Sequence, residues 1–232
     1  MFNILITGAG RGLGAEITAE ALERGHHVLA GVRDTAAQGK LAELAAQYGG
    51  QLELVQLDVA DEAGVASLAG TLRQQGKAIG AIVNNAAILV ERNTPIEDLN
   101  IEEVARTFDI NLFGPMRVVK HFLPLVTEKR GAIINISSEA GSISNAYPGD
   151  YPYGISKTAL NMFTQQLLSA VKERGIQVLS VHPGWMKTDM GGENAPTDPR
   201  QSAKGILDMI EGQLVPQGKF NFVDYTGKEM PI

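Results

Sequence analysis

The sequence predicts an α/β fold: a doubly wound parallel sheet of about seven strands with helices on both faces. Short apolar runs alternate along the whole chain with longer segments in which apolar residues recur every three or four positions. A glycine-rich turn joins the first apolar run to the first helical segment. No linker, repeat or low-complexity stretch interrupts this alternation, which is typical of a parallel sheet covered on both sides. We therefore expect a single domain over residues 1–232.

Length, charge and cysteine content narrow the classes of protein that fit. A chain of 232 residues suits one large α/β domain. The net charge of −6 and the lack of a basic stripe argue against nucleic acid and anionic membranes as partners. Because there is no cysteine, disulfides, thiolate metal sites and cysteine nucleophiles are excluded, and we expect no metal. The N-terminus does not resemble a signal peptide and no apolar run approaches the ~20 residues that span a bilayer, so we expect a cytoplasmic protein.

The first half of the chain alternates strands and helices. An apolar run over residues 2–7 predicts a buried strand that ends at Gly8, and the helical spacing of apolar residues over 12–24 ends at Gly25. Later apolar runs predict strands, and the spaced apolar residues between them predict helices. These expected strands are 27–32, 52–58 and 78–83, and the expected helices lie near 41–45 and over 65–76.

The second half continues the alternation. Spaced apolar residues predict a long helix over 101–126, in which Pro115 must cause a kink or a local break in the hydrogen bonding. Residues 183–199 lack periodicity and contain three prolines and three glycines, so we expect a mobile flap that covers the substrate. The remaining expected strands are 132–136, 176–181 and 220–223, and the remaining helices are 153–171 and 203–210.

The turn after the first strand has the pattern Thr-Gly-x-x-x-Gly-x-Gly, from Thr7 to Gly14. Glycines here allow a tight turn and a close approach of the backbone to a pyrophosphate, whose charge the helix N-terminus stabilises. A glycine-rich turn without a ligand is less favoured, because so long a pattern seldom arises by chance. The expected cofactor contacts are Gly8, Gly10, Arg11, Gly12, Leu13 and Gly14 in this turn, with Asp58 and Val59 near the adenine.

The end of the second strand indicates which dinucleotide binds. An NAD-binding chain usually has an acidic residue there for the ribose 2′-hydroxyl, whereas this chain has Gly31, with Arg33 two residues later. The guanidiniums of Arg33 and Arg11 suit the charge and geometry of a 2′-phosphate. Asp34, beside Arg33, favours the alternative that both arginines only solvate the surface. We expect NADP(H) as the preferred cofactor, with NAD(H) as the alternative.

Tyr153 and Lys157 are four residues apart on an expected helix, so one lies above the other. An ammonium beside a phenol stabilises the phenolate, and we therefore expect the pKa of Tyr153 to lie below its usual ~10. Such a tyrosine can donate and accept a proton near neutral pH. Tyr147 and Tyr151 have no lysine one helical turn later. Taken alone, the pair also fits an ordinary helix surface.

Together with the glycine turn, these residues resemble the short-chain dehydrogenase/reductases over essentially the whole chain. Within that family the chain is most similar to the small sniffer- and C-factor-like carbonyl reductases, through residues 134–138, 182–192 and 227–231. The resemblance implies a Rossmann fold with strand order 3-2-1-4-5-6-7, and hydride transfer between NADP(H) and a carbonyl or alcohol. Further motifs in the family's order are Asn84-Asn85-Ala86, Asn111, Ser138 and Pro183-Gly184.

The resemblance also implies a role for each site residue. Tyr153 would be the general acid that protonates the carbonyl oxygen, and Ser138 would hydrogen-bond that oxygen. Lys157 would hold the ribose hydroxyls of the cofactor, and Asn111 would anchor a water chain that feeds protons to Lys157. Taken singly, Ser138 also fits a cap and Asn111 a surface or packed amide. The other cofactor contacts that the resemblance implies are Asn84, Ala86, Pro183, Gly184, Met186 and Thr188.

Two positions depart from the family pattern. Ala87 replaces the glycine of the usual Asn-Asn-Ala-Gly, which is tolerable if this residue keeps a negative φ. Ser138 precedes Tyr153 by fifteen residues, more than the commoner spacing, so a longer loop is implied. Ser137 could serve instead of Ser138 only if the strand register slipped by one residue, which would turn it to the opposite face.

The substrate and the assembly are the remaining expectations. Apolar residues near the nicotinamide suggest aldehydes, ketones or quinones with loose selectivity. One alternative is a dinucleotide-sensing or C-factor-like signalling protein, which would not need the four catalytic residues together; an enoyl reductase ranks lower because it usually has a wider Tyr–Lys spacing. The helices over 101–126 and 153–171 are expected to form a homodimer or homotetramer. The expected substrate wall is Ile88, Tyr147, Trp185 and Met190, of which Met190 fits the core equally well.

Overall fold

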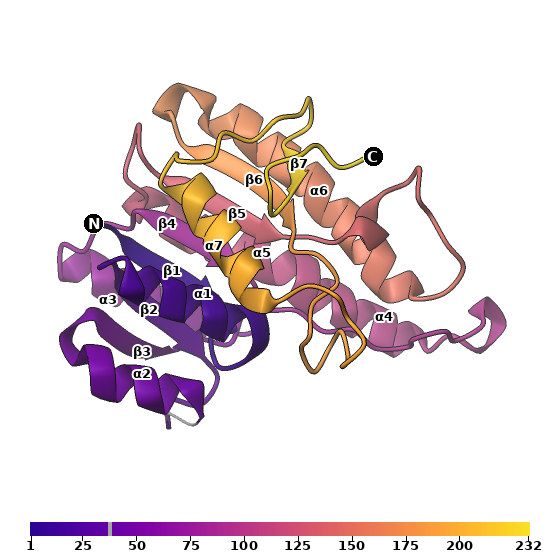
Figure 1. Cartoon of the computed structure of the whole chain (residues 1–232), viewed down its shortest axis with the longest axis horizontal. Coiled ribbons are helices and arrows are strands. Elements are labelled where there is room, and N and C mark those ends of the chain that lie inside the picture. The colour runs from indigo at the N-terminus through magenta and orange to yellow at the C-terminus, as the bar shows by residue number, and fades with distance from the viewer. Residues whose placement is uncertain (37–38) are drawn as a thin grey trace.

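The structure, a computed structural model, describes residues 1–36 and 39–232. The described strands form one seven-stranded sheet in the order β3-β2-β1-β4-β5-β6-β7, and every neighbouring pair is parallel (Figure 1). This confirms the predicted fold class and strand order. The strands are β1 (Asn3–Thr7), β2 (His27–Val32), β3 (Leu52–Gln56), β4 (Ala81–Asn84), β5 (Ala132–Ile136), β6 (Gln177–His182) and β7 (Phe222–Asp224).

Side chains of successive residues in β1 point to opposite faces of the sheet, and both faces are covered. Ile4 and Ile6 belong to one apolar core, and Leu5 belongs to the other. The first core includes residues of α1, α2 and α7, and the second includes residues of α3, α5 and α6. Figure 1 shows α1 and α7 side by side over one face of the sheet. These helices are α1 (Gly12–Glu23), α2 (Lys40–Tyr48), α3 (Glu62–Gln74), α5 (Gly114–Phe122), α6 (Tyr151–Val171) and α7 (Pro199–Ile210).

The long helix expected over residues 101–126 is divided. The helix α4 (Ile101–Phe108) is followed by a π-helical turn, Asp109–Phe113, and then by α5, which begins at Gly114. Pro115 lies in the first turn of α5, directly after the π-helical turn, and as a proline it cannot donate the backbone hydrogen bond of a regular helix. The predicted local break is therefore confirmed. Its widened turn holds Asn111.

Two helices begin earlier than their apolar spacing indicates. The helix α6 begins at Tyr151, directly after Asp150, whose φ of 47° ends the preceding loop. The helix α7 begins at Pro199, and its N-cap is Asp198, which accepts a hydrogen bond from the backbone N–H of Arg200 (3.0 Å). Caps and first-turn residues are polar or proline, so apolar periodicity does not reveal them.

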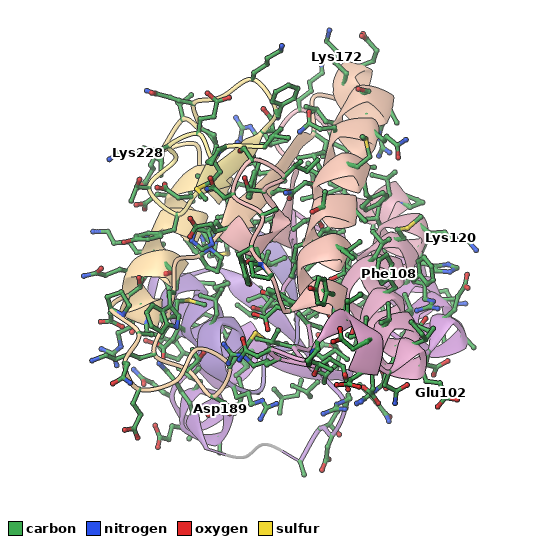
Figure 2. All side chains as sticks on the ribbon, turned by 90° about the vertical axis from the view of Figure 1, so that its right-hand side faces the viewer. Glu102, Phe108, Lys120, Lys172, Asp189 and Lys228 are labelled. Carbon is green, nitrogen blue, oxygen red and sulfur yellow. The ribbon has the colours of Figure 1, made fainter. Side chains whose placement is uncertain are left out.

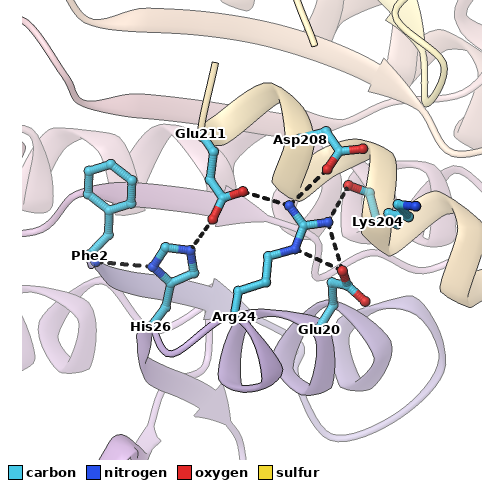
Figure 3. Close-up of polar contacts among 7 residues, drawn as sticks. All are labelled: Phe2, Glu20, Arg24, His26, Lys204, Asp208 and Glu211. Carbon is cyan, nitrogen blue, oxygen red and sulfur yellow. Dashed lines mark hydrogen bonds and ion pairs between the residues drawn. The ribbon is translucent and has the colours of Figure 1, made fainter. Parts of the chain in front are cut away.

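A cluster of charged side chains holds α7 against the C-terminal end of α1 (Figure 3). The Arg24 guanidinium lies 2.8 Å from Asp208 and 2.7 Å from Glu211, both at the end of α7. His26 donates from Nε2 to Glu211 (2.8 Å) and accepts at Nδ1 from the backbone N–H of Phe2 (3.1 Å). The cluster therefore joins the C-terminal ends of α1 and α7 on one face of the sheet.

None of the helices in the described ranges combines the length and the apolar character that crossing a bilayer requires.

Candidate functional site

The carboxyl ends of the parallel strands open into a cleft of about 520 Å³. Its walls come from the loops after β1 to β6, around the point beside β1 where the strand order reverses. The flap borders one side. The predicted site residues that line the cleft are Gly8, Gly10, Arg11, Gly12, Leu13, Arg33, Asp58, Val59, Ala86, Ile88, Tyr153, Lys157, Pro183, Met186, Thr188 and Met190.

The glycine turn has the backbone geometry that its sequence requires. Gly8 and Gly12 have φ values of 65° and 54°, which favour glycine. At Gly14 a Cβ would lie 2.3 Å from the Gly8 carbonyl oxygen, so α1 packs directly on the turn. The N-cap of α1, Arg11, makes no side-chain cap, which leaves the first N–H groups of the helix for a ligand. The turn therefore fits a pyrophosphate.

Asn85, which was not assigned a role from the sequence, locks this turn in place. Its side-chain amide donates to the carbonyl oxygens of Thr7 (3.0 Å) and Gly8 (3.1 Å). The Thr7 hydroxyl in turn accepts from the backbone N–H groups of Asn85 (3.0 Å) and Ala86 (3.1 Å). The loop after β4 and the glycine turn thus form one hydrogen-bonded unit. Ala87 does not have a positive φ, so its methyl group causes no strain.

The residues at the adenosine end differ from the simple sequence interpretation in two ways. A Cβ at Gly31 would lie 2.8 Å from Leu57 and 3.0 Å from the Ile6 carbonyl oxygen, so packing alone requires glycine there. The lack of a carboxylate at that position is therefore weak evidence on the cofactor. Arg33 is exposed, whereas Arg11 donates to the carboxylate of Asp189 in the flap (3.1 Å). Asp189 lies on the surface of the molecule, as Figure 2 shows.

Tyr153 and Lys157 both line the cleft and lie on the first two turns of α6. The Lys157 ammonium is buried, donates to the Ile136 carbonyl oxygen (2.7 Å) and lies 5.4 Å from the centre of the Tyr153 ring. Burial lowers the pKa of Lys157 to about 7. The expected depression of the Tyr153 pKa is wrong for this structure: burial raises it, and a hydrogen bond with the Ser138 side chain opposes the rise only in part.

Ser137 and Ser138 are adjacent in the chain but have different hydrogen-bond partners. The Ser137 hydroxyl donates to the Asn161 side chain (2.6 Å), so it is occupied although Ser137 borders the cleft. Ser138 caps a short 3₁₀ turn by accepting from the backbone N–H of Ala140 (3.2 Å), and it also interacts with the Tyr153 phenol. Ser138 therefore can cap this turn and also belong to the candidate site. Ser138 is not among the residues that line the cleft, but its contact with the Tyr153 phenol makes it the better candidate.

Asn111 is buried behind the cleft rather than exposed in it. Its side chain accepts from the backbone N–H of Ile88 (2.9 Å) and donates to the Ile88 carbonyl oxygen (2.9 Å). It also donates to the Ser156 hydroxyl on α6 (3.2 Å). Asn111 thus ties the loop after β4 to the helix that holds Tyr153. The water chain expected at this residue stays a prediction.

Asn84 belongs to a buried polar network and does not line the cleft. Its side chain donates to Asn135 (2.8 Å), which donates to Thr164 on α6 (2.9 Å). Thr164 and Ser180 share a further hydrogen bond of 2.7 Å. The network joins β4, β5, β6 and α6 behind the site, so its effect on a cofactor is through position. Asn135, Thr164 and Ser180 sit within apolar runs, which is why the sequence did not single them out.

Thr188 and Gly184 shape the flap. Thr188 lies against the glycine turn: a Cβ at Gly12 would be 3.6 Å from its methyl group. Gly184 has a φ of 83° and does not border the cleft.

Two of the four residues expected in the substrate wall also lie outside the cleft lining. Tyr147 is exposed and donates to Asp150 (3.0 Å), and Trp185 is exposed and donates to the Gly191 carbonyl oxygen (2.7 Å).

A parallel sheet of this order, with a glycine turn at β1 and a tyrosine–lysine pair in the same cleft, defines the class of dinucleotide-binding oxidoreductases. The family model described as short chain dehydrogenase matches residues 3–199. The chain therefore belongs to the short-chain dehydrogenase family.

Several characterised proteins are similar over much of their length. The carbonyl reductase Sniffer of D. melanogaster has a TM-score of 0.91 and 30% identity, covering 100% of both chains. The NADPH-bound carbonyl reductase from chicken fatty liver has a TM-score of 0.88 and 30% identity, covering 100% of this chain and 99% of that one. The C-signal protein of Myxococcus xanthus is 35% identical over 157 residues, which cover 66% of this chain and 92% of that protein.

Proposed function

We propose that this protein is an NADPH-dependent carbonyl reductase for aldehydes, ketones or quinones, with Tyr153 as the proton donor. One observation carries the proposal: Tyr153 and Lys157 line the same cleft as the glycine turn. When bound, NADPH supplies the hydride that reduces the carbonyl carbon. Similarity to a carbonyl reductase that holds NADPH supports this cofactor.

Each region of the cleft has a proposed binding task. The first N–H groups of α1 and the glycine turn hold the pyrophosphate. Arg33 and Arg11 hold the 2′-phosphate, and Asp58 and Val59 border the adenine. Asn84 and Gly184 act through position rather than by contact. The residues proposed to hold the nicotinamide and its ribose are Lys157, Ala86, Pro183, Met186 and Thr188.

The proton comes from the chain's own residues. Because the pKa of Tyr153 is raised, the phenol is protonated at neutral pH and can donate to the substrate oxygen. The Ser138 hydroxyl hydrogen-bonds the same oxygen and stabilises its developing charge. Lys157, with a pKa of about 7, gains and loses a proton near neutral pH and can restore the proton on Tyr153. Asn111 positions the helix that carries both groups.

A second candidate function is dinucleotide sensing or signalling, which the similarity to C-signal supports. A sensor needs the glycine turn but has no use for a proton donor beside the cofactor. Tyr153, Lys157, Ser138 and Asn111 together therefore favour the enzyme. Separate measurements of cofactor binding and turnover distinguish the two functions.

The test is Tyr153→Phe, assayed as NADPH oxidation against a panel of aldehydes, ketones and quinones. Losing a general acid lowers the rate by about 10²- to 10⁴-fold, so we expect that loss in kcat/KM for every substrate that the wild type reduces. NADPH binding, followed by fluorescence, should persist. Tyr151→Phe, at the start of the same helix, is the matched control and should keep its activity. Near-normal turnover by Tyr153→Phe would refute the assigned acid, and a wild type that binds NADPH without turnover would favour the sensor.

A further inference from the structure

Three loops meet at the mouth of the cleft, and Arg92 lies where they join. Arg92 belongs to the loop after β4, and its Nη1 donates to the Met190 carbonyl oxygen in the flap (3.2 Å). Met190 lines the cleft together with Tyr153. On the other side, a Cβ at Gly149 would lie 3.6 Å from the Cα of Asn93, so the loop before α6 contacts the same segment. Arg92 therefore lies outside the lining of the cleft itself, at its rim, in contact with the lining residue Met190.

The backbone on either side of Arg92 has an unusual conformation. Glu91 and Asn93 both have a φ of 56°, the left-handed region that non-glycine residues rarely adopt. The Glu91 carboxylate is directed to the backbone N–H of Asn100 (3.4 Å), toward α4. The two neighbouring side chains therefore point in different directions: Arg92 contacts the flap, and Glu91 contacts the start of α4.

The charge of Arg92 reaches the reactive group. Burial raises the pKa of both Tyr147 and Tyr153, and the positive charge of Arg92 opposes this rise in part at both phenols. Asp150 acts in the opposite direction on both, but one of its carboxylate oxygens accepts from the Tyr147 hydroxyl (3.0 Å). The mouth therefore has a cationic side at Arg92 and a side at Asp150 where the carboxylate is partly engaged.

The Arg92 guanidinium is exposed and retains binding capacity. A guanidinium has five N–H donors, and the contact with the neutral Met190 carbonyl uses one of them. By contrast, Arg24, Arg106 and Arg117 each contact a carboxylate within the chain. Arginine prefers planar, doubly hydrogen-bonded anions such as carboxylates.

We propose that Arg92 binds a carboxylate on the carbonyl substrate, so that the preferred substrates are aldehydes or ketones that also carry an acidic group. This inference rests on the proposed carbonyl reductase activity. Ile88 and Met190 contact the apolar part of the substrate, while Arg92 holds its acidic end at the mouth of the cleft. The side of the mouth near Asp150 repels the same anion, which fixes the orientation of the substrate.

The experiment compares two aldehydes of similar shape and different charge, 4-carboxybenzaldehyde and methyl 4-formylbenzoate. The readout is the ratio of kcat/KM for the acid to kcat/KM for the ester. We expect the wild type to favour the acid and Arg92→Gln to lower the ratio by about 10- to 100-fold, the usual effect of losing a charged hydrogen-bond pair. Arg106→Gln is the matched control: Arg106 is exposed on α4, pairs with Glu103 and should leave the ratio unchanged.

The other outcomes are decisive as well. An equal loss of kcat/KM for both aldehydes would mean that Arg92 only supports the flap through Met190, and would overturn the proposal. Turnover of the ester with an unchanged ratio in Arg92→Gln would also overturn it while leaving the reductase function intact. If neither aldehyde is reduced, benzoate is titrated against the fluorescence of Trp185, the chain's single tryptophan. Saturable quenching that Arg92→Gln abolishes supports the anion site, and its absence overturns it.

Discussion

At the scale of single residues, the half-buried Tyr153 and the buried Lys157 form a pair whose two pKa values are shifted in opposite directions by the loss of water contact. Both groups prefer their uncharged form when water is removed, so the pKa of the lysine falls and that of the tyrosine rises. The sequence interpretation considered only the attraction between the ammonium and a phenolate. It could not include desolvation, because the burial of Lys157 depends on the packing of α6 against β5.

The Lys157 shift predicts a pH dependence of stability. Lys157 titrates near 10.5 in the unfolded chain and about 7 in the folded protein. Between these values the unfolded chain binds more protons, so the contribution of Lys157 to the free energy of unfolding increases with pH in that window and is constant below it. The free energy of unfolding of the wild type minus that of Lys157→Met should therefore rise by a few kcal/mol between pH 7 and pH 9.5. Urea denaturation at several pH values measures this difference, and parallel profiles for the two proteins would contradict it.

At the residue level, the sequence grouped residues that share a cleft where spacing alone sets geometry, and their roles stay predictions. The glycine turn and the Tyr153–Lys157 pair lie within single local segments, and the structure brings both to one cleft. Asn84, Tyr147 and Trp185 were assigned to the cleft but lie outside its lining. The direction of their side chains depends on partners far away in the chain or in the same loop. Asn85 was missed because a hydrogen bond to the glycine turn has no local signature.

At the scale of elements, the flap is joined to the rest of the cleft by few polar contacts. The Arg11–Asp189 ion pair connects it to the glycine turn, and Arg92 connects it to the loop after β4. The side chains of Arg11 and Asp189 are 80% and 77% exposed, so their pair adds little to stability. The ion pair matters instead because it places the Asp189 carboxylate beside Arg11, which is proposed to hold the 2′-phosphate.

Asp189→Asn should therefore change cofactor affinity selectively. Removing this carboxylate frees Arg11 and lessens repulsion of the 2′-phosphate, so we expect NADPH to bind a few-fold more tightly while NADH affinity changes less. Fluorescence titration with each dinucleotide measures both dissociation constants. Glu193→Gln removes a charge elsewhere on the flap and serves as the control. Equal effects on NADPH and NADH would contradict an involvement of Arg11 with the phosphate.

The boundaries of the helices show which features of the fold depend only on nearby residues in the chain. Pro115 predicted a break in the long helix, because a proline has no backbone N–H to donate wherever it occurs. The width of that break, a π-helical turn from Asp109 to Phe113, was not foreseen. Directly after this turn Gly114 packs against Val59, where a Cβ would lie 2.8 Å away. This contact joins residues 55 positions apart in the chain, so no local pattern contains it.

At the scale of the whole molecule, the parallel α/β class was predictable because the sequence repeats one simple unit. Buried strands alternate with amphipathic helices, and parallel crossovers of this kind have one hand. The point where the order reverses places the glycine turn at the carboxyl edge of the sheet. The resemblance to a known family then supplied the full order. The cluster around Arg24 was not foreseen, since its charges come from the ends of α1 and α7.

The molecule also has an apolar face formed by α4, α5, α6 and the π-helical turn. Figure 2 looks toward this side, on which Phe108 and Lys120 are labelled. A hollow of about 460 Å³ on this side is lined in part by Phe113, Met116 and Phe163. Large apolar side chains exposed on these elements are Ile101 (70%), Phe113 (46%), Met116 (41%), Ile155 (54%) and Met162 (62%). Exposing so many apolar side chains to water in one region is unfavourable. Packing of a second copy of the chain against this face would bury them.

We therefore expect a homodimer or homotetramer in solution that uses this face. In a symmetric interface each substitution occurs twice, so Met162→Glu should weaken association by at least about tenfold and shift the protein toward monomers. Light scattering coupled to size-exclusion chromatography measures the mass at several protein concentrations. Val215→Glu is the matched control, because Val215 is 75% exposed and lies outside these helices. A monomeric wild type, or an equal effect of both substitutions, would contradict the interface. Since α6 holds Tyr153 and Lys157 on its first turns, assembly through its outer face would also stabilise the helix on which the proposed chemistry depends.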